Sequence, residues 1–138
     1  MEPFLQQVLD MYPDEVKLVI KYFPLSQHKY SRKAAKAALA ANAQGKFWEF
    51  HGKLFENYED INDAKIQGIA RELNLDMEMF TGDMESPAIQ SLIARDLYNG
   101  RQVGVDGTPT VFINGKMLRN LSVKGFYQMI EAELRRAR

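Results

Sequence analysis

The 138-residue sequence contains no cysteine, and this absence limits its chemistry. Without a thiol, these residues can form no disulfide, bind no metal through a thiolate and supply no cysteine nucleophile. Histidine is also scarce, with two residues, and there is a single tryptophan. Lys plus Arg equals Asp plus Glu, at 18 each. This balance gives no excess of positive charge that would favour binding to nucleic acid, so we expect no nucleic-acid partner.

Long apolar runs are absent too, and we therefore expect no membrane partner. The first residues do not combine positive charge, an apolar core and a small-residue cleavage site, which is the pattern of an export leader. As written, the chain would be cytoplasmic, although a mature periplasmic chain would look the same. The fractions of hydrophobic and charged residues, 46% and 26%, are typical of a globular domain. The length predicts one domain with its own core.

The most specific pattern occupies residues 105–116. Residues 107–109, Gly-Thr-Pro, predict a sharp bend, and residues 110–113 predict a β-strand because they are rich in β-branched and aromatic side chains. The Asn-Gly pair at 114–115 favours a two-residue hairpin turn. Pro109 would open the strand, where its missing N–H removes no ladder hydrogen bond.

Elsewhere the apolar periodicity predicts mainly helices. One further strand is expected at residues 16–23, with Val16, Leu18 and Ile20 on one face. Helices are expected at residues 4–12, 30–42, 46–57, 62–73 and 122–134, a short turn at 76–81, and a helix that starts at Pro87. Asn62, Ser86 and Ser122 are the expected N-caps.

The helix at residues 46–57 carries two neighbouring apolar stripes. One contains Phe47, Phe50 and Leu54, and the other contains Trp48, His51 and Phe55. This width predicts burial on two sides, so we interpret the aromatic residues as core and not as a ligand pocket. His51 is interpreted as a packed or partly exposed residue. Two histidines in separate elements, without a Glu-x-x-His pattern, predict no metal site, and no sequence pattern predicts a cofactor.

Together these motifs resemble the DsbA-like branch of the thioredoxin superfamily. A run typical of that branch, Gly-Val-x-Gly-Thr-Pro-Thr followed by Phe-Ile-Asn-Gly, is present in residues 104–115. Two more stretches agree with the branch: Tyr22, Phe23, Pro24 and Leu25 with His28, and residues 44–51 with Leu54 and Phe55. The resemblance runs from Met1 to the end and implies an α/β, helix-rich, thioredoxin-like fold. The body would comprise residues 1–25 and 103–138, and an inserted helical subdomain residues 26–102.

The resemblance also implies the site and the activity. In that branch the proline equivalent to Pro109 is cis, lies against the active-site sulfurs and leaves the neighbouring backbone free to pair with an extended polypeptide substrate. Thr108 and Pro109 are therefore the expected substrate-binding residues. The redox pair, Cys-x-x-Cys, would precede Met1, and so would the central first strand. We expect thiol–disulfide exchange in a full-length form, which in this branch is typically periplasmic, and an inactive chain here, with no catalytic residue of its own.

A body without its central strand has an open place in the sheet. About five buried backbone groups would lack partners at roughly 1–3 kcal/mol each, which approaches the whole stability of a domain, about 5–15 kcal/mol. We therefore expect residues 16–23 and 110–113 to pair directly, and the chain to form a homodimer or another self-associated species through the incomplete sheet.

Two alternative functions stay open. The chain could be a non-catalytic module that binds peptides or assembles with other chains through the Thr108–Pro109 edge. It could also belong to a cysteine-free enzyme similar to the kappa-class glutathione transferases and hydroxychromene carboxylate isomerases. These use a serine in place of the thiol, and that serine would also precede Met1.

Overall fold

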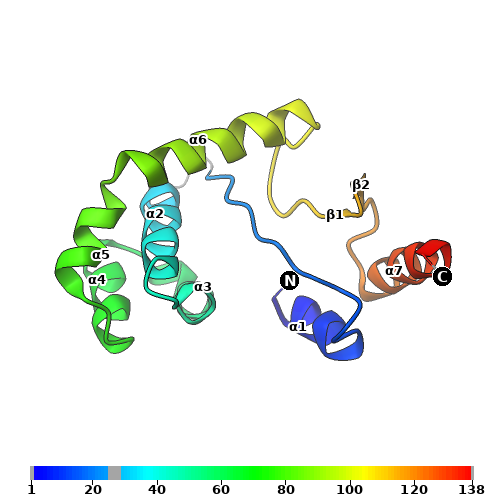
Figure 1. Cartoon of the computed structure of the whole chain (residues 1–138), viewed down its shortest axis with the longest axis horizontal. Coiled ribbons are helices and arrows are strands. Elements are labelled where there is room, and N and C mark those ends of the chain that lie inside the picture. The colour runs from blue at the N-terminus through cyan, green and yellow to red at the C-terminus, as the bar shows by residue number, and fades with distance from the viewer. Residues whose placement is uncertain (1, 25–28, 138) are drawn as a thin grey trace. The chain divides into compact units, whose positions relative to one another are not determined.

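The structure, a computed structural model, describes residues 2–24 and 29–137 and is rich in helices, as expected (Figure 1). Leu25 and His28, which support the resemblance above, lie outside the described residues. In chain order the elements are α1 (Glu2–Met11), α2 (Ser31–Asn42), α3 (Phe47–Glu56), the 3-10 helix η1 (Tyr58–Asp60), α4 (Asp63–Glu72), α5 (Met77–Met84), α6 (Pro87–Gln102), β1 (Phe112–Ile113), β2 (Lys116–Met117) and α7 (Val123–Ala137).

These elements divide into two compact units. The terminal unit contains the chain up to Lys21 together with the chain from Val105 onward, and the helical unit contains Tyr22–Gly104. The terminal unit thus includes α1, the β1–β2 hairpin and α7, whereas α2 to α6 belong to the helical unit.

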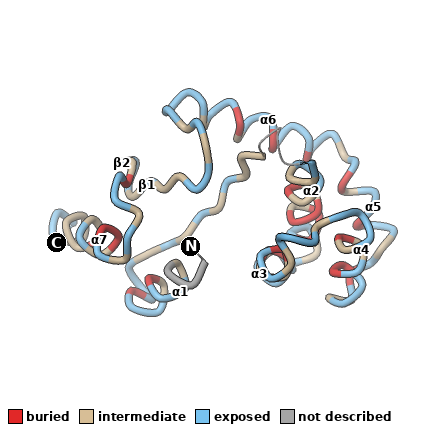
Figure 2. The backbone as a smooth tube through the Cα atoms, turned by 180° about the vertical axis from the view of Figure 1, so that it is seen from behind, coloured by how far each residue is buried: buried red, intermediate tan, exposed pale blue. Residues whose placement is uncertain are grey.

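Helix α2 supplies much of the core of the helical unit, and Figure 2 shows buried residues along it. Its sequence is rich in alanine, which favours helix and lets neighbouring helices approach closely. Five of its alanines are at most 1% exposed: Ala35, Ala37, Ala38, Ala40 and Ala41. The bulkiest fully buried side chains come from the surrounding helices and include Phe50 and Phe80, whose ring centroids lie 5.7 Å apart. Burying each such side chain stabilises the unit by about 1.5–3 kcal/mol.

The three predicted N-caps are confirmed. The side chain of Asn62 accepts a hydrogen bond from the backbone N–H of Lys65 at 2.8 Å, and Ser86 accepts one from Ile89 at 3.3 Å. Ser122 accepts one from Gly125 at 3.1 Å. The short turn expected at residues 76–81 is wrong, because helix α5 continues to Met84. Phe80 and Met84 are four residues apart and both buried, so burial of one helix face extends α5 past Gly82.

The terminal unit is held by a small core between α1, the hairpin and α7. Its buried members are Val8, Tyr12, Leu118, Phe126 and Ile130. The hydroxyl of Tyr12, the residue after α1, donates a hydrogen bond of 2.5 Å to Glu131 Oε1 on α7. This bond and burial raise the pKa of Tyr12 from 10.0 to about 12, with the bond the larger cause.

Gly125 marks a close approach inside this unit. A Cβ at this position would overlap the backbone oxygen of Asn120. Only glycine therefore allows the start of α7 to pack so closely against the chain that leads into it.

The strand expected at residues 16–23 is wrong. This segment carries no strand, and the described residues form a single two-stranded sheet, β1 with β2. Exposure still alternates from Val16 to Lys21, with Val16, Leu18 and Ile20 on the less exposed side. Direct pairing with residues 110–113 is therefore wrong as well. The β-branched residues favour an extended backbone, but a strand also needs a hydrogen-bonded neighbour.

The two-sided burial expected for α3 is only half right. Phe50, Leu54 and His51 are buried, but Trp48 and Phe55 are each 50% exposed.

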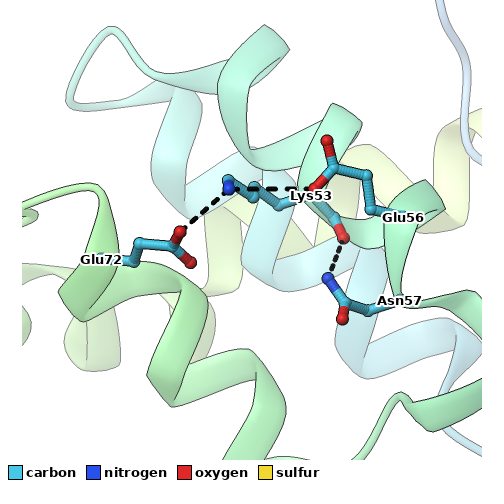
Figure 3. A network of polar contacts seen from close by, with 4 residues as sticks. All are labelled: Lys53, Glu56, Asn57 and Glu72. Carbon is cyan, nitrogen blue, oxygen red and sulfur yellow. Dashed lines mark hydrogen bonds and ion pairs between the residues drawn. The ribbon is translucent and has the colours of Figure 1, made fainter.

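Lys53, on the same helix, joins α3 to α4: its Nζ donates to Glu72 Oε1 at 2.9 Å and lies 3.8 Å from Glu56 Oε2 (Figure 3). Asn57 Nδ2 donates to the backbone oxygen of Lys53 at 2.8 Å and closes the end of α3 (Figure 3).

Candidate functional site

The predicted site lies in the loop between α6 and β1. The Thr108–Pro109 peptide bond is cis, and both side chains are exposed. The hydroxyl of Thr110 donates a hydrogen bond of 2.7 Å to the backbone oxygen of Gly107. This bond closes the bend from Gly107 to Thr110 and leaves Thr108 and Pro109 on its outer side, accessible to solvent. The role of the Thr110 hydroxyl was not predicted; its only sequence signal is a threonine three residues after the glycine of the bend.

The hairpin after the loop has the predicted turn. Asn114 and Gly115 adopt φ values of 49° and 81°, the left-handed conformation that a two-residue hairpin turn requires. In register, Phe112 lies opposite Met117 and Ile113 opposite Lys116. The predicted strand at residues 110–113 is shorter than expected, since only Phe112–Ile113 is assigned to β1.

This register leaves one edge of β1 open. The N–H of Leu118 donates to the backbone oxygen of Val111 at 2.8 Å, so Val111 and Ile113 direct their backbone polar groups toward β2. Backbone groups of alternate residues point to opposite sides of a strand, and those of Phe112 therefore point away from β2. Within the described residues, β1 pairs with β2 alone. The outer edge beside Phe112, which is 36% exposed, can accept an extended chain.

An ion pair fixes the hairpin to α7. Lys116 Nζ lies 2.7 Å from Glu133 Oε1, and Arg136 lies 3.8 Å from the same oxygen. The hydrogen bond from Lys116 lowers the pKa of Glu133 below its ordinary value, against the opposing effect of burial. No sequence pattern predicts this pair, because its members belong to different elements. The edge of β1 is thus presented on a hairpin that α7 holds in place.

The histidine prediction agrees with the structure. His51 is 4% exposed and lies among aromatic rings, with Phe47 stacked at 5.5 Å between centroids and the Tyr22 hydroxyl 3.2 Å from its Nδ1. No three His, Asp or Glu side chains in residues 2–24 and 29–137 are grouped closely enough to hold a metal ion.

Comparison with known proteins places this geometry in a family. The chain belongs to the DSBA-like thioredoxin domains, which match residues 3–130. A solved structure of a thioredoxin-like oxidoreductase from Silicibacter pomeroyi DSS-3 is similar over 99% of this chain and 78% of its own, with 30% identity and a TM-score of 0.83. The predicted thioredoxin-like, helix-rich fold is therefore confirmed.

A second solved structure shows the same fold. It is the thiol-disulfide exchange protein alpha-DsbA2 from Wolbachia pipientis, with 21% identity, a TM-score of 0.83, and coverage of 96% of this chain and 72% of that one. In both comparisons the cysteine-free sequence of this chain aligns with most of a longer protein.

Some relatives in sequence are named as Na(+)/H(+) antiporters and not as oxidoreductases. A Na(+)/H(+) antiporter NhaA from Herminiimonas arsenicoxydans is 34% identical over 108 residues, which are 78% of this chain and 17% of the relative. NhaA 1 from Salinispora arenicola is 34% identical over 116 residues, which are 83% and 18% of the two chains. The chain thus spans less than a fifth of these relatives. In the part that the structure describes, no helix has the length and apolar character needed to cross a bilayer.

Proposed function

We propose that these 138 residues bind extended polypeptides for thiol–disulfide exchange, and that the exchange itself needs a cysteine pair that the sequence does not contain. Family membership supports the reaction class. The open outer edge of β1, directly after the exposed Thr108 and Pro109, is the observation that carries the binding part of the proposal.

In the 138-residue chain a bound polypeptide would lie along β1 as an added strand, at the edge that the central first strand would occupy in a longer form. In that longer form the polypeptide would contact the exposed Thr108 and Pro109 instead. In the 138-residue chain the N–H of Phe112 would donate to the polypeptide and the C=O of Phe112 would accept from it, while Thr108 and Pro109 contact its side chains. Each such hydrogen bond contributes about 0.5–1.5 kcal/mol net. This predicts weak, reversible binding with little dependence on side-chain identity, as suits an oxidoreductase that acts on many proteins.

Binding can be measured by fluorescence anisotropy with a labelled, extended, cysteine-free peptide. We expect saturable binding that Phe112→Pro abolishes. Proline at this position removes the N–H that points away from β2, and it leaves the hydrogen bonds between β1 and β2 intact. Met117→Pro is the matched control: Met117 lies opposite Phe112, so its N–H points to the other edge of the hairpin. Circular dichroism would verify that both variants fold. Absence of binding, or equal losses in the two variants, would contradict the proposal.

The exchange reaction gives a separate test. The 138-residue chain should not reduce insulin disulfides, because it has no thiolate to attack them. A longer form that supplies a Cys-x-x-Cys pair ahead of residue 1 should accelerate their reduction by dithiothreitol, which reduces the pair again after each exchange, and Thr108→Val in that form should change turnover. An active 138-residue chain would refute the requirement for a cysteine pair.

A second copy of the chain could occupy the same edge. We propose self-association through β1, since an unpaired strand edge recruits other strands. Light scattering over a range of micromolar concentrations should then detect an oligomer that dissociates in Phe112→Pro but not in Met117→Pro. A strictly monomeric wild-type chain would contradict this part alone.

The antiporter relatives favour one more candidate, a polypeptide-binding domain that is part of a membrane transporter. An antibody against the chain would then detect a much larger protein in the membrane fraction of the source cells. Detection of a protein of this size only, outside the membrane fraction, would reject this candidate.

A further inference from the structure

Helix α3 presents two large aromatic side chains to solvent. Trp48 and Phe55 are each 50% exposed. They are seven residues apart, which is about two helical turns, so both lie on one face, roughly 10 Å from each other along the axis. We call Trp48 and Phe55, with Glu49, Gly52 and Glu56 beside them, the α3 face. It belongs to the helical unit, whereas Thr108 and Pro109 belong to the terminal unit.

The aromatic rings of the α3 face are held in place by neighbouring rings, of which His51 is buried and Phe47 is partly buried. His51, which is 4% exposed, lies between them in sequence, with ring centroids 5.9 Å from Trp48 and 4.8 Å from Phe55. Phe47 meets the Trp48 ring edge-on at 5.0 Å. Rings that are already ordered lose little conformational entropy when a partner binds. Exposed, rigid aromatic side chains of this kind are typical centres of binding energy in interfaces.

Acidic groups accompany the two rings along the helix. Glu49 follows Trp48 and Glu56 follows Phe55, and their side chains are 47% and 67% exposed. Lys46 lies 3.5 Å from Glu49. Lys53 lies 3.8 Å from Glu56 but bonds more closely to Glu72, at 2.9 Å. Residues 46–60 contain four acidic and two basic side chains, so acidic groups outnumber basic groups along this part of the chain.

Gly52 leaves room between the two carboxylates. A Cβ at this position would meet no atom within 4 Å. A partner backbone can therefore approach α3 here, between Glu49 on one turn and Glu56 two turns further along. The α3 face thus combines a narrow apolar stripe, an acidic border and a shallow central position.

We propose that the α3 face docks a cationic amphipathic helix of another polypeptide. Apolar side chains at i and i+7 of that helix match the spacing of Trp48 and Phe55. Its flanking Lys or Arg residues would meet Glu49 and Glu56, and one of them could lie over the Trp48 ring. Two half-exposed aromatic side chains offer roughly 150–250 Å² of surface in total. Such a contact is small, so we expect reversible binding on the order of micromolar or weaker.

Trp48 makes the test direct because it is the only tryptophan. The full chain would be titrated with a helical peptide of leucine and lysine that has the i, i+7 leucine spacing and no aromatic residue. We expect a saturable blue shift of the Trp48 emission that weakens as salt increases. A peptide of leucine and glutamate with the same leucine positions should produce no shift.

Three variants separate this docking from non-specific association. Glu49→Gln combined with Glu56→Gln should weaken the apparent affinity about three- to tenfold, and Phe55→Ala should weaken it about tenfold or more. Tyr98→Ala, which removes a 63% exposed aromatic side chain from α6, should leave the affinity unchanged. The double glutamine variant removes no buried group, so it tests the proposal even if Phe55→Ala folds poorly.

Four results would overturn the proposal. The first would be that the lysine peptide produces no shift, and the second that the glutamate peptide produces an equal one. The third would be that iodide fails to quench the Trp48 fluorescence in the chain alone, which would mean that other residues of the same chain cover the α3 face. A shift that grows with protein concentration in the absence of peptide would assign the face to a contact between copies, as between it and the basic Lys29, Arg32 and Lys36 of the α2 region.

Discussion

Replacing Tyr12 by phenylalanine removes the hydroxyl that joins the segment after α1 to α7, and little else. The Tyr12 side chain is 8% exposed and belongs to the core of the terminal unit, and phenylalanine keeps the ring that packs there. The substitution therefore isolates the 2.5 Å hydrogen bond to Glu131. It tests whether one polar contact between distant parts of the sequence stabilises the terminal unit.

The kind of hydrogen bond gives the size of the effect. A hydrogen bond to a charged group contributes about 1.5–3 kcal/mol. The pKa of Tyr12 rises from 10.0 to about 12 in part through the same bond, but the rise also includes repulsion between a phenolate and Glu131, which the neutral hydroxyl does not experience. Water can still reach Glu131, which is partly exposed, so we expect a loss of about 1.5–2.5 kcal/mol in the free energy of unfolding. With a urea slope of about 1.5 kcal/mol/M, the midpoint falls by about 1–1.7 M.

The pH dependence gives an independent check on the same contact. Folding raises the pKa of Tyr12, so the folded chain holds the phenol proton more tightly than the unfolded chain. The stabilisation is complete below pH 10, and it is lost as the pH rises from 10.0 to about 12. The wild-type chain should therefore lose stability across this pH window. Tyr12→Phe has no phenol at this position, so it should not show the share of that loss which Tyr12 causes.

Urea unfolding followed by circular dichroism at pH 8 and pH 11 would measure both effects. Tyr98→Phe is the matched control, because Tyr98 is 63% exposed and its hydroxyl loss should change stability by less than about 0.5 kcal/mol. A Tyr12→Phe variant as stable as this control would refute the reasoning. So would a difference from wild type that stays the same at both pH values.

Three further predictions concern the frame of the site and the helices. Lys116→Gln should raise the pKa of Glu133 toward its ordinary value, since the Lys116 hydrogen bond is the main cause that lowers it; carboxyl NMR titration would measure this, and an unchanged pKa would contradict the ion pair. Because a lowered pKa stabilises the folded state above the unfolded value, this variant should also lose less stability than wild type on acidification below pH 4.5. Gly125→Ala should destabilise the chain by about 2 kcal/mol or more, because its Cβ would overlap the backbone oxygen of Asn120. Gly68→Ala, in open space on α4, should stabilise it by about 0.5–1 kcal/mol in the same urea experiment, and equal effects would refute the steric argument. Asn62→Ala should cost about 1 kcal/mol through the lost N-cap of α4, and a thermal midpoint equal to that of wild type would contradict it.

Sequence reasoning succeeded where the cause is local. The N-caps Asn62 and Ser86 and the Asn114–Gly115 turn are fixed by neighbouring residues, so their signals are short and readable. The alanine-rich helix and the hairpin followed from the same kind of pattern. The positions of Thr108 and Pro109 came from the family resemblance, which the comparisons support at the level of family and fold.

Sequence reasoning failed where the cause is distant. Residues 16–23 have the composition of a strand, but pairing depends on a partner that no local pattern reveals. The sequence predicts Trp48 and Phe55 to be core residues, because hydrophobicity alone does not tell which side of α3 a neighbouring element covers. The contacts Tyr12–Glu131 and Lys116–Glu133 join residues of different elements, and the sequence contains no pattern that links them.

The terminal unit is assembled from both ends of the chain, with Tyr22–Gly104 between them. Its two halves must find each other across a loop of about 80 residues, at an entropic cost of about 4 kcal/mol for a flexible loop. The helical unit is contiguous and faces no such cost. During synthesis it can become ordered before α7 leaves the ribosome, and its order then shortens the effective loop. Removal of residues from either end would therefore harm the Thr108–Pro109 region first and the alanine-rich core last.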